Sequence, residues 1–216
     1  MKVRGADLAS FDDRYTLRYV RVLPAPIERV WRAVTTAEEL NVWLYPICRI
    51  EAKLGGRVSF TWGGPERDPQ VGEITVFEPP RRIRFSWTGR EREGGYLELA
   101  LQAVDDRTRL TFIDRFDPGF RHDQSGVAPG DKAASLPAGL DTPWRPGFVA
   151  GFHLNLDYLG VILRQRWSPE RIERQSTENV EIARGEREGT FESGPDSPWS
   201  ELVEVYYEHI QRTCPR

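Results

Sequence analysis

Cysteine and histidine are scarce in this sequence of 216 residues. The two cysteines, Cys48 and Cys214, lie far apart, which excludes a disulfide framework and fits a reducing compartment. The three histidines are His122, His153 and His209, and no two of them have a spacing typical of metal ligands. We therefore expect no metal and no cofactor, and we interpret both cysteines as structural.

Long apolar runs and a charge excess are also missing. No run approaches the ~18 apolar residues of a membrane span, and residues 1–20 contain no apolar core of a signal peptide. The net charge is −3, which makes nucleic acid a poor first choice of partner. We expect a cytoplasmic protein that binds neither a membrane nor nucleic acid.

The first part of the chain is predicted to form one strand and two short helices. The strand is expected over 14–23. Pro26 suits the first turn of a helix, because its missing N–H group costs nothing there. Thr36 and Glu39 form a T-x-x-E capping box, which predicts the start of the second helix.

The middle of the chain alternates short apolar-polar runs with turn signals. This pattern predicts six antiparallel strands, each with one apolar and one polar face, of which the last covers 108–116. An unusually long loop, 117–142, follows. A long helix with one apolar side is then expected within 142–166.

The composition changes after this helix. Residues 167–196 are highly charged and weakly patterned, and we interpret them as a linker. A last helix is predicted over 197–212, with an apolar side that must be buried on its own domain or on a second subunit of a homodimer. We divide the chain into an N-terminal arm (1–13), one domain (14–166) and this extension (167–216).

The order of these elements is strand, two helices, six strands and one long helix. It predicts an α+β fold in which a curved antiparallel sheet of about seven strands wraps the long helix. A helix laid across a strongly curved sheet does not fill the concave side completely. We therefore expect a cavity, on the order of several hundred Å³, between the helix and the sheet.

Several motifs carry a family resemblance. They are "VLPAPIERVWRAVTTAEELNVWL", "GGRVSF", "GEITVFEPPRRIRFSW", "TRLTF" and "GFHLNLDYL", and they cover roughly 14–166. Together they resemble the SRPBCC superfamily, the helix-grip fold of birch-pollen-allergen-like proteins, and within it the domain shared with activators of a heat-shock chaperone ATPase. The resemblance implies the helix-grip fold. It implies no catalytic residues, because the superfamily holds binding proteins, cyclases, lipid carriers and chaperone regulators on one scaffold.

A carboxylate interrupts the apolar face of the last strand, "RLTFIDRF". Alternation places Asp114 on the same face as Phe112 and Phe116. An ionised carboxylate in an apolar site is costly unless it is paired or solvated. Asp114 is therefore either a polar anchor or acid–base group in a ligand pocket, or a strand-end aspartate paired with an arginine such as Arg115 or Arg145.

Aromatic side chains are predicted to form the wall of the cavity. Such a wall suits a small hydrophobic or aromatic ligand, although the same side chains equally suit a filled core. Strand parity and the helix stripe select Trp62, Trp87, Phe112, Phe148 and Phe152, and Asp114, Phe116 and Trp144 complete the candidate ligand-binding set.

Other features have a functional and a structural interpretation. His153 and Asp157 lie four residues apart on the predicted long helix and suit acid–base chemistry, but such a pair is more often a helix-surface hydrogen bond. His122 lies on the long loop and either closes over a ligand or is solvated. The stretch "GGPERDP" is not placed between a strand and a helix, so we do not expect it to bind phosphate.

Three functions follow from these observations. The favoured one is binding of a small hydrophobic or aromatic molecule in the cavity. The second is an enzyme of the cyclase, dehydratase or hydrolase type, with Asp114 as the acid or base. The third is a protein-interaction module that regulates a chaperone, which we favour least because the chain lacks the separate N-terminal domain of the eukaryotic activators.

Overall fold

The computed structural model describes residues 7–44, 47–61, 69–87, 94–118, 131–137, 139–187 and 198–215. The strands are β1 (Ser10–Asp13), β2 (Thr16–Leu23), β3 (Ile47–Ile50), β4 (Arg57–Thr61), β5 (Gln70–Glu78), β6 (Arg82–Trp87), β7 (Tyr96–Val104) and β8 (Arg107–Arg115). The helices are α1 (Ile27–Thr35), α2 (Ala37–Trp43), α3 (Pro146–Arg164), α4 (Pro169–Arg184) and α5 (Pro198–Thr213).

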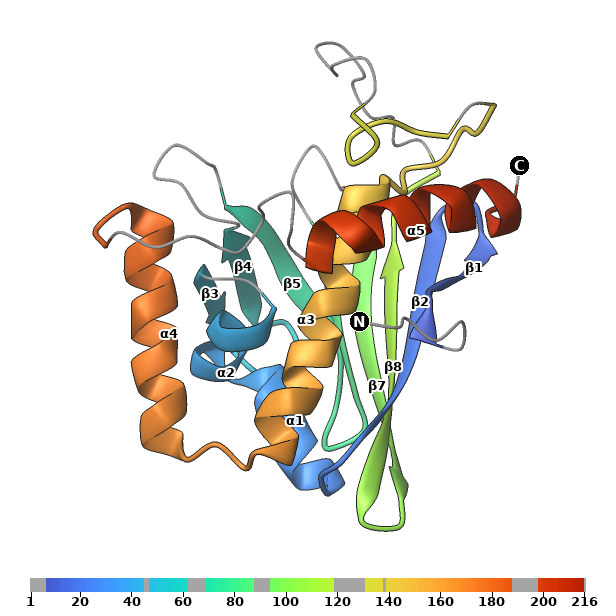
Figure 1. Ribbon diagram of the computed structural model, residues 1–216. Helices are drawn as coiled ribbons and strands as arrows, with labels where there is room; N and C mark the ends of the chain where they lie inside the picture. The colour runs from blue at the N-terminus through green and yellow to red at the C-terminus, as the bar shows by residue number, and fades with distance from the viewer. Residues whose placement is uncertain are drawn as a thin grey trace.

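The strands form one antiparallel sheet in the order β1-β2-β8-β7-β6-β5-β4-β3. Strands β3 to β8 are consecutive neighbours joined by short connections, and β2 lies beside β8. The long helix α3 runs along one face of this sheet (Figure 1). This arrangement confirms the predicted α+β helix-grip fold. The sheet has eight strands rather than about seven, because part of the predicted N-terminal arm forms β1.

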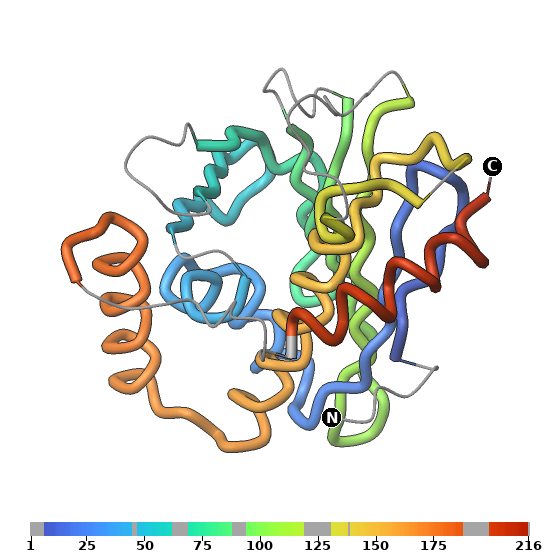
Figure 2. Tube along the Cα trace, turned by 45° about the horizontal axis from the view of Figure 1, so that its top comes forward, coloured from blue at the N-terminus to red at the C-terminus, as the bar shows by residue number. Residues whose placement is uncertain are grey.

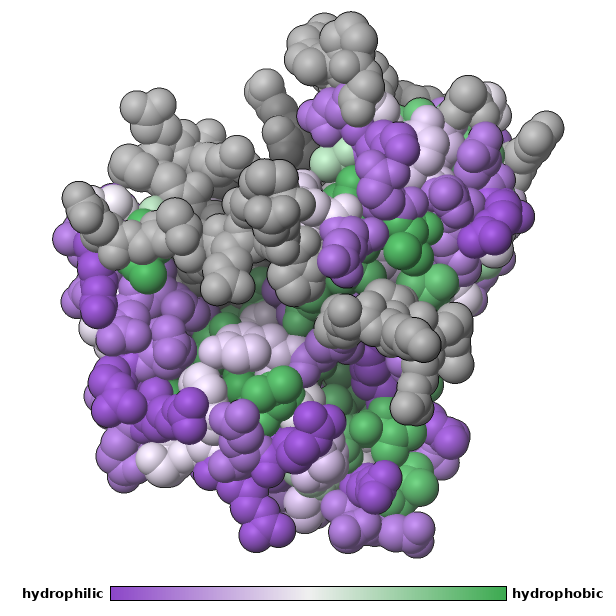
Figure 3. All heavy atoms as spheres, in the orientation of Figure 1, coloured by the Kyte–Doolittle hydropathy of each residue, from purple (hydrophilic) through white to green (hydrophobic). Residues whose placement is uncertain are grey.

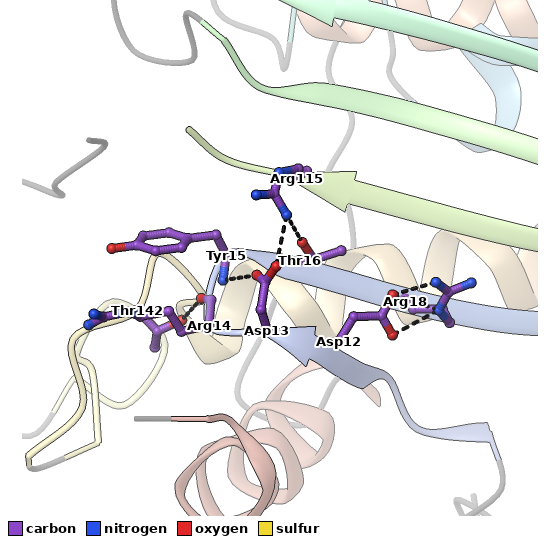
Figure 4. A network of polar contacts seen from close by, with 8 residues as sticks. All are labelled: Asp12, Asp13, Arg14, Tyr15, Thr16, Arg18, Arg115 and Thr142. Atoms are coloured by element: carbon purple, nitrogen blue, oxygen red, sulfur yellow. Dashed lines mark hydrogen bonds and ion pairs between the residues drawn. The ribbon is translucent and has the colours of Figure 1, made fainter. Parts of the chain in front are cut away.

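Charged side chains hold β1 against its neighbours (Figure 4). Asp13 Oδ1 accepts a hydrogen bond from the backbone N–H of Tyr15 at 2.7 Å, and Asp13 Oδ2 accepts one from Arg115 Nη1 at 2.8 Å. Asp12 pairs with Arg18 of β2. The segment has too few apolar residues to alternate visibly, so its strand conformation depends on these partners rather than on a local pattern.

The predicted capping box of the second helix is wrong. Thr36 is the N-cap residue of α2 but makes no side-chain capping bond, and its hydroxyl donates to the carbonyl of Arg32 at 3.1 Å. The Glu39 carboxylate is buried and lies 2.9 Å from both Arg29 and Arg32. Hydrogen bonds between charged groups are stronger than neutral ones, so the arginines outcompete the helix N-terminus for this carboxylate.

Helix α4 occupies most of the stretch that the sequence pattern indicated as a linker. The Ser168 hydroxyl caps its start by accepting from the N–H of Arg171 at 3.4 Å, and Gly185, with a φ of 73°, ends it in the left-handed conformation. The buried side of α4 is narrow, with Ile172 and Ala183 as its apolar members. A helix with so few apolar contacts has a weak periodic signal, which explains why the pattern did not reveal it.

Helix α5 packs on α3 of the same chain, as the views in Figure 1 and Figure 2 agree. Its apolar side is fully buried at Leu202, Tyr206 and Ile210. The side predicted to need a partner is therefore covered within the chain. A homodimer stays a prediction.

The hydrophobic core lies between the sheet and the helices. On the face that carries α3, α4 and α5, hydrophilic residues dominate the margins and hydrophobic residues show between the elements (Figure 3). Among the described residues, no helix is long and apolar enough to cross a membrane.

Candidate ligand-binding site

Asp114 is the penultimate residue of β8 and points inward. In the sheet it lies opposite Leu17 of β2 and Leu97 of β7, and all three residues are fully buried. Phe112 precedes it on the same face, and Phe116 follows just beyond the strand. The alternation of "RLTFIDRF" therefore placed the carboxylate correctly, in a row of leucine and phenylalanine side chains.

The side chain of Arg115 lies on the face of β8 opposite to that of Asp114. Its Nη1 donates to Asp13 at 2.8 Å, near the hairpin of β1 and β2 (Figure 4). The other arginine named as a partner for Asp114 is Arg145, which immediately precedes α3. Arg115 is therefore excluded as the arginine that pairs with Asp114. Arg145 and the other arginines stay candidates for that partner.

Five residues of the predicted ligand-binding set meet at the end of β8 and the start of α3. We call Phe112, Phe116, Trp144, Phe148 and Phe152 the aromatic cluster. Ring centroids are 4.8 Å apart for Phe112 and Phe152, 4.7 Å for Phe148 and Phe152, and 5.0 Å for Phe116 and Trp144. These are favourable aromatic separations, so the strand and the helix are joined here by ring-to-ring packing.

The remaining wall residues are not part of the aromatic cluster. The Trp87 ring lies 5.6 Å from Phe60, which in turn lies 5.7 Å from Phe85. This second group belongs to β4 and β6. Trp62, His122 and nearly all of "GGPERDP" lie outside the described residues.

His153 and Asp157 form the predicted pair, but not on a helix surface. His153 Nε2 lies 3.3 Å from Asp157 Oδ2, yet the imidazole is only 2% exposed. Its Nδ1 is 2.7 Å from the hydroxyl oxygen of Tyr206, because α5 covers this side of α3. Asp157 Oδ1 also accepts from Nε of Arg21, at 3.3 Å. The predicted i,i+4 contact is therefore present, but its histidine is buried, and the pair belongs to a polar network between β2, α3 and α5.

Arg21 also belongs to this network, although we did not predict it as a site residue. It lies on the inward face of β2 in register with Leu110, and its side chain is 9% exposed. The signal was available, since Arg21 interrupts the apolar series of Tyr19 and Leu23 by the same parity that singled out Asp114.

Burial sets the protonation of the tyrosines in this network. It raises the pKa of Tyr206 to about 12 and the pKa of Tyr19 well above its ordinary value. Both phenols are therefore protonated at neutral pH. Tyr19 donates to the carbonyl of Val149 at 2.6 Å, and the hydroxyl oxygen of Tyr206 accepts from the N–H of Ala9 at 3.2 Å.

The pKa of Asp157 is lowered in the folded protein. Burial acts to raise this pKa, but the hydrogen bond and charge of His153 and the charge of Arg21 outweigh it. Because the folded pKa lies below the unfolded value, the unfolded chain binds a proton first as the pH falls. The stabilisation by this carboxylate is thus present above about pH 4 and is lost below it.

We expect Asp157→Asn to flatten the acid side of the stability profile. The free energy of unfolding of the wild type should fall below about pH 4 more steeply than that of the variant. Urea unfolding at several pH values measures both slopes. The matched control is Asp141→Asn, which alters an exposed ion pair with Arg14. Equal acid slopes for Asp157→Asn and the wild type would show that the network does not depend on this charge.

The cysteines offer no nucleophile. Cys48 and Cys214 are both free and buried, and burial raises the pKa of each thiol. Within the described ranges, no group of three or more His, Cys, Asp or Glu side chains is arranged to hold a metal ion.

Residues 24–140 match the model of a family described as "Activator of Hsp90 ATPase homolog 1-like protein". The match covers more than half of the chain, from the end of β2 to the segment before α3. No curated protein matches the chain.

Solved structures share the fold. A conserved protein of unknown function from Enterococcus faecalis is 15% identical, with a TM-score of 0.58 over 96% of this chain and 91% of that one. A protein from Mesorhizobium loti is 17% identical (TM-score 0.52; 71% of this chain, 99% of that one). One from Nitrosomonas europaea is 21% identical (TM-score 0.50; 72% and 98%). At these identities the likeness establishes the fold alone. By the match over 24–140, the chain belongs to the family of activator of Hsp90 ATPase homolog 1-like proteins.

Proposed function

We propose that the chain binds a small apolar or aromatic molecule between α3 and the sheet, near the end of β8. The observation that carries this proposal is the fully buried Asp114 in a row of apolar residues beside the aromatic cluster. Ligand sites are mostly apolar and contain a few polar groups that orient the bound molecule. Asp114 beside the aromatic cluster matches this composition.

The aromatic cluster also supports a route by which a ligand could enter from the surface. Phe148 is half-buried, whereas Phe112, Phe152 and Trp144 are fully buried. The cluster therefore reaches the surface at the start of α3. Rings packed edge to face, as Phe148 and Phe152 are, present both faces and edges to an incoming aromatic molecule.

Two leucine variants of β7 test this proposal. Leu97 lies beside Asp114, where a ligand would sit, whereas Leu99 lies beside Phe112 in the packed centre of the sheet. We expect Leu97→Phe to occupy the ligand space, with little loss of stability and about a tenfold loss of affinity for the fluorescent probe N-phenyl-1-naphthylamine. Leu99→Phe, the matched control, should lose about 1–3 kcal/mol of stability through overpacking and keep the affinity within about twofold.

Fluorescence titration and urea unfolding give the two readouts. If the wild type does not bind the probe, or if Leu97→Phe binds it as well as the wild type, the proposed site is wrong. Equal destabilisation by both substitutions would indicate a filled interior at Leu97 and would also contradict the proposal.

The two other functions stay predictions. An enzyme using Asp114 needs a second polar group within reach of the same ligand atom, and the described histidine–carboxylate pair of α3 is bound instead to Tyr206 and Arg21. The family name concerns activation of the Hsp90 ATPase, and a chaperone-regulating role for this chain rests on that name alone.

A further inference from the structure

The indole of Trp144 is enclosed by the aromatic cluster. Trp144 is fully buried just before α3, with its ring stacked at 26° on Phe148 and edge-on to Phe116. The ring of Phe11 lies 6.5 Å away. Trp144 therefore lies among aromatic rings, which offer its N–H group no strong acceptor.

Three other tryptophans of the chain have an acceptor for the indole N–H. Trp43 Nε1 donates to the carbonyl of Ala33 at 2.8 Å. Trp167 Nε1 donates to a side-chain oxygen at 2.9 Å, and Trp199 Nε1 donates to the carbonyl of Gly147 at 3.1 Å. Trp144 Nε1 differs, because it is buried and makes no hydrogen bond within the part of the chain that the structure describes.

An unpaired buried donor is costly, and native proteins leave few of them. Buried tryptophan usually finds a partner for its N–H. Because Trp144 lies in the site proposed above, the missing acceptor is most simply supplied by the bound molecule.

We infer that the ligand is a neutral aromatic carbonyl compound whose oxygen accepts the hydrogen bond from Trp144 Nε1. This inference rests on the proposed function and names the chemistry of its ligand. The indole N–H only donates, so the ligand group must be an acceptor. The surrounding rings select an apolar aromatic body. Burial among apolar rings disfavours an ionised ligand group, so the acceptor is a neutral one.

Two probes of similar shape separate the acceptor from the apolar body. Acetophenone carries a carbonyl oxygen, and cumene carries a methyl group in its place. In protein with ¹⁵N-labelled tryptophan, the indole proton missing from Trp144→Phe identifies the Trp144 signal. We expect acetophenone to move this signal downfield, and cumene to bind without that shift.

The affinities give a second readout. Trp144→Phe should bind acetophenone about tenfold more weakly than the wild type and should bind cumene within about twofold of it. The matched control is Trp199→Phe, which removes an indole donor that already has the carbonyl of Gly147 as its acceptor. Its affinity for both probes should stay unchanged.

The outcomes distinguish this inference from the proposed function. If both probes bind, but Trp144→Phe affects them equally and the Trp144 signal does not shift, the inference is wrong and the proposed function stands. In protein freed of any co-purified molecule by unfolding and refolding, a Trp144 signal that is already hydrogen-bonded without probe and unmoved by acetophenone would identify water as the acceptor and would also overturn it. Binding of neither probe would overturn both.

Discussion

Tyr206→Ala is expected to lower the free energy of unfolding by about 4 kcal/mol. Tyr206 is fully buried between α5 and α3, and its hydroxyl meets His153 Nδ1 at 2.7 Å and the backbone N–H of Ala9 at 3.2 Å. Truncation removes the ring and leaves both of these buried groups without their partner, so a cavity and a desolvation penalty act together. Urea unfolding monitored by circular dichroism measures the loss.

The neighbouring tyrosine supplies the control for this prediction. Tyr207 is half-buried on the same helix, and its ring contacts Lys132. We expect Tyr207→Ala to cost about 1 kcal/mol or less. If Tyr206→Ala is no more destabilising than Tyr207→Ala, α5 is a detachable appendage and the network around His153 contributes little to the fold.

Phe112→Ala is expected to cost about 3–5 kcal/mol. Phe112 is fully buried in the middle of β8, and its ring lies 4.8 Å from Phe152 of α3 and 6.1 Å from Tyr19 of β2. It therefore connects the sheet to the long helix. Thermal and urea unfolding of the variant measure the loss.

Ile113→Ala is the matched control, because Ile113 is the next residue of β8 and lies half-buried on the outer face. We expect it to cost about 1 kcal/mol. Similar losses for the two variants would mean that α3 is not held to the sheet through the aromatic cluster.

The sequence predicts those features that depend on local patterns. The alternation around Asp114 fixes which side chains of β8 point inward, and strict period-two patterns place most of the other strands. The apolar stripe of α3 likewise predicts that Phe152 and Leu156 face the core, where both are buried. From the inward parity of two distant segments, the sequence could also predict that their aromatic residues meet.

Features that depend on distant partners could not be predicted in this way. Glu39 does not cap the helix as predicted, because its carboxylate pairs with two arginines that face it in the folded protein. His153 is buried only because α5 returns across α3 and supplies Tyr206. The lack of an acceptor for the indole N–H of Trp144 could not be predicted, because it depends on which rings surround the indole in the folded protein. In each case a tertiary contact, absent from any local window of sequence, decides the environment of the side chain.

Native mass spectrometry of the freshly purified protein tests most directly whether a small molecule occupies the site between α3 and the sheet. We predict a folded mass that exceeds the polypeptide mass by that of one small molecule, an excess that denaturation removes and whose occupancy is lower in Leu97→Phe. The released compound should be aromatic and carry a carbonyl group. A folded mass equal to that of the polypeptide alone, both before and after incubation with N-phenyl-1-naphthylamine, would contradict the account.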